Sequence, residues 1–67
     1  MDFKGIVKPR RRGGWIARGL IVEERHGQIF ETQIGPREFA EPATSLQWLR
    51  EVATQMGCSR PELAVVT

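Results

Sequence analysis

Residues 44–56 read TSLQWLREVATQM, and this stretch carries the strongest periodic pattern in the chain. At 100° per residue, its apolar side chains fill one arc of about 160° and polar side chains take the rest. The apolar arc consists of Leu46, Trp48, Leu49, Val52, Ala53 and Met56. Thr44 with Gln47 three residues on predicts an N-cap, and Gly57 predicts the C-terminal end. We therefore expect an amphipathic helix over about 44–56 that lies on a sheet, with Leu49 near the centre of the buried arc.

Three stretches before this helix predict β-strands, at about 3–8, 15–24 and 28–34, because they are rich in β-branched and aromatic residues or alternate in polarity. Pro9 ends the first strand, His26-Gly27 marks a turn after the second, and Gly35-Pro36 ends the third. The sequence therefore predicts an α+β fold. We expect a three-stranded antiparallel meander with one helix packed on one face (β-β-β-α), forming a single domain over 1–67.

The loop at His26-Gly27 decides which strand faces coincide, because a shift of one residue moves every side chain to the other face. A loop of two residues pairs Arg25 with Gln28, and a loop of four keeps the same parity. Either loop puts seven residues on the face that we expect under the helix: Trp15, Ala17, Gly19, Ile21, Phe30, Thr32 and Ile34. A loop of three would instead bring together Ile16, Leu20, Val22, Phe30 and Ile34.

The C-terminal residues 58–67 admit two readings. Residues 59–62 have the spacing of a capping box and predict a tail with a short helical turn. Residues 63–66, Leu-Ala-Val-Val, are equally suited to a strand. We give the helical turn slight preference.

A chain of 67 residues can bury one small core, which leaves a domain marginally stable unless a staple or a second subunit adds burial. Cys58 is the only cysteine and His26 the only histidine, so neither a disulfide nor a structural zinc site is expected. The lone thiol and the absence of a signal-like start predict a cytoplasmic protein. No run approaches the roughly 18 apolar residues of a membrane span, so we expect no membrane association.

Catalysis is the class of function that the sequence supports least. Asp2 is the only aspartate, His26 lies in a predicted turn, and Cys58 follows the predicted helix end. Their spacing in the sequence does not indicate a nucleophile beside a general base. We therefore expect a non-enzymatic protein with no catalytic residue, cofactor, metal ligand or small-molecule substrate.

Apolar residues on the second face of the sheet suggest an interaction module. Three strands and one helix cover only one face, which leaves the other to water or to a partner. Five residues would lie there: Ile6, Ile16, Leu20, Val22 and Ile29. Our first hypothesis is a self-associating interaction or structural module, expected to be a homodimer.

Basic residues gather near the first turn and support an alternative. Residues 1–18 hold six basic side chains against one acidic, whereas residues 19–67 hold four against seven. Such a pole attracts phosphates or meets the acidic half of another copy. The candidate nucleic-acid contacts are Lys8, Arg10, Arg11, Arg12 and Arg18, with Trp15 as a stacking residue. The alternative function is therefore a nucleic-acid-binding accessory protein.

Residues 14–18, Gly-Trp-Ile-Ala-Arg, followed by a turn, a strand and a helix, resemble two known groups over roughly residues 3–57. One is a set of small uncharacterised proteobacterial proteins with a three-strand-plus-helix layout. The other comprises the sheet-reading DNA-binding domain of plant ethylene-response factors and the amino-terminal arm-binding domain of phage-type integrases. In the DNA-binding group basic residues occur on all three strands, whereas here the third strand carries Glu31 and only Arg37 lies beyond it. Resemblance to the first group implies a small cytoplasmic protein without known activity and is compatible with a dimer.

Overall fold

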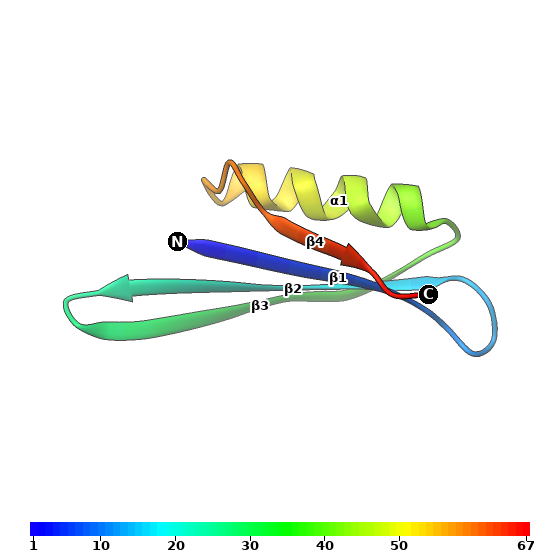
Figure 1. The fold of residues 1–67 in the computed structure, drawn as a ribbon, viewed down its shortest axis with the longest axis horizontal. Coiled ribbons are helices and arrows are strands. Elements are labelled where there is room, and N and C mark those ends of the chain that lie inside the picture. Colours follow the sequence, from blue (N-terminus) through cyan, green and yellow to red (C-terminus); the bar gives the residue numbers. More distant parts are fainter.

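The computed structural model describes residues 1–67 and forms two layers, a four-stranded sheet and one helix on one of its faces (Figure 1). Along the chain the elements are β1 (Asp2–Pro9), β2 (Trp15–Arg25), β3 (Gln28–Phe39), α1 (Pro42–Gln55) and β4 (Glu62–Val65). The strand order in the sheet is β3-β2-β1-β4. The predicted fold of three antiparallel strands with one helix packed on the sheet is confirmed, and a short fourth strand is added to it.

The turn between β2 and β3 sets the register of the sheet. His26 and Gly27 form a two-residue loop with φ angles of 53° and 78°, and Arg25 pairs with Gln28. Positive φ at both positions is typical of a type I′ turn, whose twist suits a hairpin. The register predicted for a two-residue loop is therefore confirmed, and the alternative with three residues is wrong. Ala17 and Ile21 accordingly lie buried beneath α1.

The third strand does not end at Gly35-Pro36 as expected, because the chain passes this point through a β-bulge. Gly19 pairs with Ile34 and Ala17 with Arg37, so β3 holds one residue more than β2 between these pairs. Gly35 has a φ of 81°, and a Cβ there would lie 2.8 Å from the Ala17 carbonyl oxygen. The bulge on an edge strand accommodates a proline that an inner strand would exclude. Pairing then resumes, and β3 continues to Phe39.

The helix begins two residues earlier than predicted. Its N-cap is Glu41 rather than Thr44, and Pro42 occupies the first turn, where its missing N–H costs nothing. The Thr44 hydroxyl donates to the Glu41 carbonyl at 2.9 Å, so it still satisfies a group at this helix end. At the other end Gly57 has a φ of 86° and its N–H donates to the Thr54 carbonyl, which confirms the predicted stop.

The preferred helical turn within residues 58–67 is wrong, since residues 62–65 form β4. This strand runs parallel to β1, with Lys4 beside Glu62 and Val7 beside Val65. Parallel neighbours need a long connection, and the chain between β1 and β4 contains β2, β3 and α1. The helix α1 returns the chain from the end of β3 to the start of β4 (Figure 1). β1 is therefore an inner strand, and the open edges of the sheet belong to β3 and β4.

The core lies between α1 and the middle of the sheet. Its buried residues are Phe3, Val7, Ala17, Ile21, Leu49, Ala53 and Cys58. Leu49 is fully buried, as the helical pattern predicts. Phe39 and Trp48 close one end, with ring centroids 5.6 Å apart. The guanidinium carbon of Arg37 lies 5.1 Å from the Phe39 ring centre and 5.4 Å from that of Trp48.

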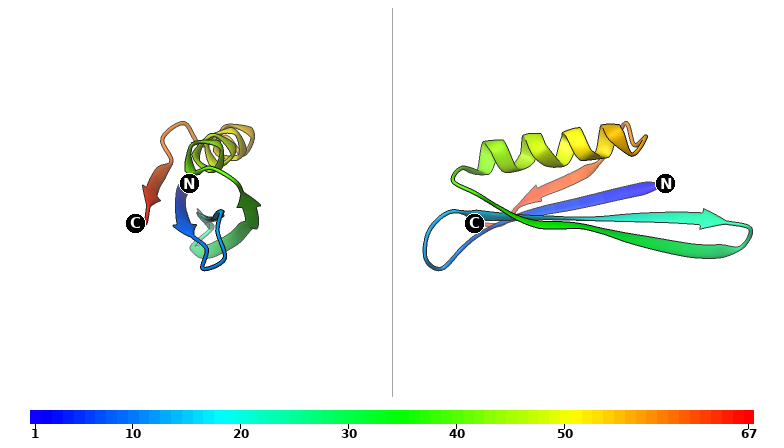
Figure 2. Two further views of the ribbon diagram at one scale, coloured as in Figure 1. Left: turned by 90° about the vertical axis from the view of Figure 1, so that its right-hand side faces the viewer. Right: turned by 180° about the vertical axis from the view of Figure 1, so that it is seen from behind.

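The β2–β3 hairpin extends well past the helix (Figures 1 and 2). A helix of 14 residues is about 21 Å long, whereas a strand of 12 residues reaches about 40 Å. Phe30 and Thr32 share the face of Ala17 and Ile21 as predicted, but both are exposed. Thr32 lies beside Ile21 on the edge strand β3, and Phe30 lies further along, on the overhanging part of the hairpin. Phe30 is 48% exposed for this reason. The expectation that these two residues pack under the helix is therefore wrong.

Candidate interaction surface

The sheet has a second face, opposite α1, which no part of the chain covers (Figure 1). We call it the outer face. Its side chains are the alternate residues of each strand, because successive residues of a strand point to opposite sides. All five apolar residues predicted for self-association have this parity: Ile6, Ile16, Leu20, Val22 and Ile29. The structure therefore brings the whole predicted set onto one face.

Four of these five residues are half-buried although no layer covers them, whereas Ile29 is 68% exposed. The register explains the difference. Ile6 lies directly opposite Arg18, and Leu20 opposite Lys4. Long basic side chains lay their methylene groups along neighbouring apolar surface while their charges stay in water. The outer face is therefore an alternating pattern of aliphatic and charged side chains.

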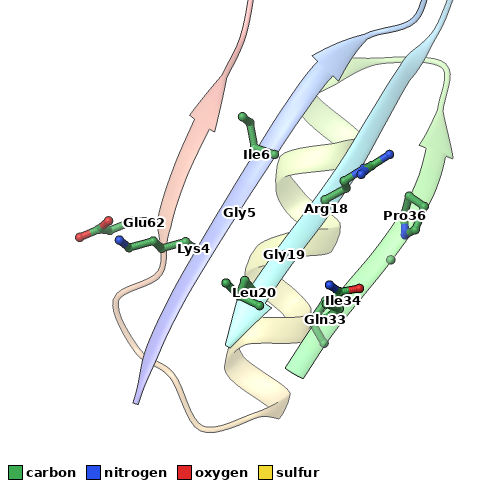
Figure 3. A pocket seen from close by; sticks show the side chains of 11 residues that line it. Lys4, Gly5, Ile6, Arg18, Gly19, Leu20, Gln33, Ile34, Pro36 and Glu62 are labelled. Carbon is green, nitrogen blue, oxygen red and sulfur yellow. The ribbon is translucent and has the colours of Figure 1, made fainter. Parts of the chain in front are cut away.

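A hollow of about 490 Å³ lies at the centre of the outer face. Figure 3 shows α1 behind the sheet and the lining side chains in front of it. Side chains from all four strands surround the hollow: Lys4, Ile6, Arg18, Leu20, Gln33 and Glu62. Gly35 and Pro36 of the bulge complete its rim. Both apolar and charged groups are thus available to an occupant.

One end of the outer face is basic. Lys8 and Arg18 project from it, and the loop carrying Arg10, Arg11 and Arg12 adjoins them. The loop bends to the side of the sheet away from α1 (Figures 1 and 2). Arg10 is 3.1 Å from the Glu38 carboxylate, which it neutralises.

The other end of the outer face is acidic. Asp2 lies opposite Val22, and Val22 lies opposite Glu31 on its other side. Glu24 follows on the same face, two residues further along β2. All three carboxylates are on exposed residues, and the nearby Arg25 is held by Glu23 at 2.8 Å. The charge of the outer face therefore changes sign along the strands.

The sequence identified only part of this surface. Glu62 was missed because β4 was predicted as a helical turn, and Pro36 because it was expected to end a strand. Lys4 carried a usable signal, since it alternates with Phe3 and Gly5 in the predicted first strand. The stacking of Arg37 on Trp48 depends on the bulge, which places Arg37 beside α1, and it had no signal in the spacing.

No group of three or more His, Cys, Asp or Glu side chains in the chain is arranged to hold a metal ion. None of its helices is both long and apolar enough to cross a membrane. The chain matches no protein-family model, and no curated protein or solved structure is detectably similar to it.

Proposed function

We propose that this chain is a small non-enzymatic interaction module that forms a homodimer through its outer face. The observation that carries the proposal is the uncovered hollow and its aliphatic side chains, Ile6 and Leu20 among them. Sheets bury their apolar faces against another layer, and this sheet has a layer on one side only. A second copy supplies the missing layer. We place the module in the cytoplasm, where a lone thiol such as Cys58 stays reduced.

The small size of the core supports this proposal. Only nine of the 67 residues are buried, so the isolated chain has little apolar burial to offset the entropy of folding. Dimerisation adds burial without a disulfide or a metal ion, and it stabilises the folded state in a concentration-dependent way. Self-association therefore compensates for what the single core lacks.

Sedimentation velocity tests the proposal. We expect the chain to pass from monomer to dimer across micromolar concentrations, because one face of a four-stranded sheet in a chain of 67 residues offers only a small interface. Leu20→Glu should abolish the dimer, since it puts a carboxylate into the hollow. Ala43→Glu adds the same charge at an exposed position on α1 and should leave the dimer intact. A strict monomer throughout, or equal behaviour of the two variants, would refute the proposal.

A second candidate function, nucleic-acid binding, is favoured by the exposure of the basic loop. Arg11 and Arg12 are exposed and form no ion pair within the chain, whereas Arg10 is partly engaged by Glu38. Lys8 and Arg18 lie on the face toward which the loop bends. Unpaired guanidinium groups on a projecting loop are suited to the phosphates of a duplex.

Salt-dependent binding to duplex DNA tests this second candidate. The slope of log K against log salt should flatten by about 0.9 when Arg11→Ala removes one phosphate contact. Replacing Arg10, Arg11 and Arg12 together by alanine should remove most binding. The matched control replaces Arg25, Arg50 and Arg60, which alters net charge equally but leaves the loop intact. An absence of binding at low salt, or equal losses in the two triple variants, would exclude this function.

A further inference from the structure

The charge polarity of the outer face restricts how two copies can pair, if the proposed homodimer forms. Three lines of paired residues cross the sheet in order. The first line is Lys8, Ile16 and Glu38, and the last is Asp2, Val22 and Glu31. The middle line is Glu62, Lys4, Leu20 and Gln33, in which the charges of Lys4 and Glu62 lie side by side. Arg18 lies between the first two lines, opposite Ile6. The face is therefore basic on one side of Leu20 and acidic on the other.

Two face-to-face arrangements keep the strands of both copies aligned, as in common sheet packings. A two-fold axis parallel to the strands places the basic end of one copy on the basic end of the other. An axis that lies between the sheets and runs across the strands places the basic end on the acidic end. Like charges in contact across an interface are strongly unfavourable, so the second arrangement is favoured.

We infer that the two copies pair with antiparallel strands about an axis that passes at Leu20. The two Leu20 side chains then meet and fill the hollow from both sides. One line away, Arg18 lies above Val22 of the second copy, between the carboxylates of Asp2 and Glu31 of that copy. The two-fold symmetry repeats this contact, so two guanidinium groups lie among four carboxylates. These charged groups flank the aliphatic contact between the two Leu20 side chains on both sides.

The carboxylates at the acidic end are free to accept these contacts. Glu31 and Asp2 are exposed and form no ion pair within the chain, and the same is true of Arg18. Arg25, the basic side chain nearest to them in β2, is already held by Glu23. Arg18 is two residues from Leu20 in one direction along β2, and Val22, which Asp2 and Glu31 flank, is two residues from it in the other direction.

Cysteine cross-linking tests this orientation directly. Leu20→Cys should give a disulfide-linked dimer on mild oxidation, because the axis brings this position onto itself. Ile16→Cys should not, since eight residues of strand would separate the two thiols by about 27 Å, far beyond disulfide reach. The unsubstituted chain is the background control, because Cys58 is buried. Linking through Ile16→Cys as readily as through Leu20→Cys would overturn the inferred orientation.

A charge reversal separates this inference from the proposed function. Arg18→Glu should weaken the dimer by about tenfold or more, and the added change Glu31→Arg should restore it, as measured by sedimentation. Adding salt should weaken the unsubstituted dimer. If the unsubstituted chain dimerises but neither the reversal nor its restoration changes affinity, the orientation is wrong and the proposed function stands. If it stays monomeric, both are wrong.

Discussion

Phe3→Ala is expected to lower the free energy of unfolding by about 3–5 kcal/mol, the usual cost of removing a buried phenylalanine. Phe3 is 1% exposed, and its ring lies over one glycine of each inner strand, β1 and β2. A Cβ at Gly19 would come within 3.0 Å of the ring, and one at Gly5 within 3.5 Å. The ring therefore occupies space that these glycines leave open, and alanine would leave a cavity there.

Phe30→Ala is the matched control, because it removes the same side chain from the overhanging hairpin. Phe30 is 48% exposed, so its truncation should cost well under the loss at Phe3. Urea unfolding followed by the fluorescence of Trp15 and Trp48 measures both variants. Equal losses would mean that the hairpin packs against a layer that the structure does not contain.

Leu49→Ala is expected to cost about 2–5 kcal/mol, which is comparable with the entire stability of a domain this small. Leu49 is fully buried at the centre of the helical stripe. One of its methyl groups lies against Gly5, where an added Cβ would be 3.0 Å away. The variant should be largely unfolded near body temperature.

Gln47→Ala tests the opposite face of the same helix. Gln47 is exposed, and its amide donates to the Glu51 carboxylate at 3.3 Å, an interaction worth only a few tenths of a kcal/mol. Alanine is also the better helix former, so the two effects nearly cancel. Thermal melts of both variants at one protein concentration decide the question. A Leu49→Ala protein that melts within a few degrees of the parent would show that α1 is not packed on the sheet as described.

The parts of the fold that were predictable depend on local periodicity. The apolar arc centred on Leu49 requires no knowledge of distant residues, and the two-residue loop at His26-Gly27 sets the parity of both hairpin strands. With a loop of two or four residues these two features place Ala17 and Ile21 under the helix, and the structure excludes the alternative of three residues. They also place the aliphatic residues of the outer face, Leu20 among them, opposite it.

The parts that were missed depend on contacts between distant segments. Residues 62–65 become a strand only because β1 offers a free edge beside them, and a capping-box spacing contains no information about that edge. The sequence at Gly35-Pro36 predicts a strand end, because proline is found mainly at strand ends, edges and bulges, and it does not distinguish among the three. Strand continuation to Phe39 depends on pairing with Trp15, which is 24 positions away in the chain. For the same reason Glu62 and Pro36 were absent from the predicted surface.

The bulge in β3 also determines which kinds of assembly are open to the chain. An outer strand of 12 regularly paired residues would be a template for further strands, and chains added edge to edge would grow without limit. Pro36 has no N–H to donate at this edge, and the extra residue interrupts the regular spacing of donors and acceptors. At the opposite edge β4 has only four residues. Growth of a continuous sheet is thereby disfavoured at both ends, whereas pairing through the faces closes after two copies.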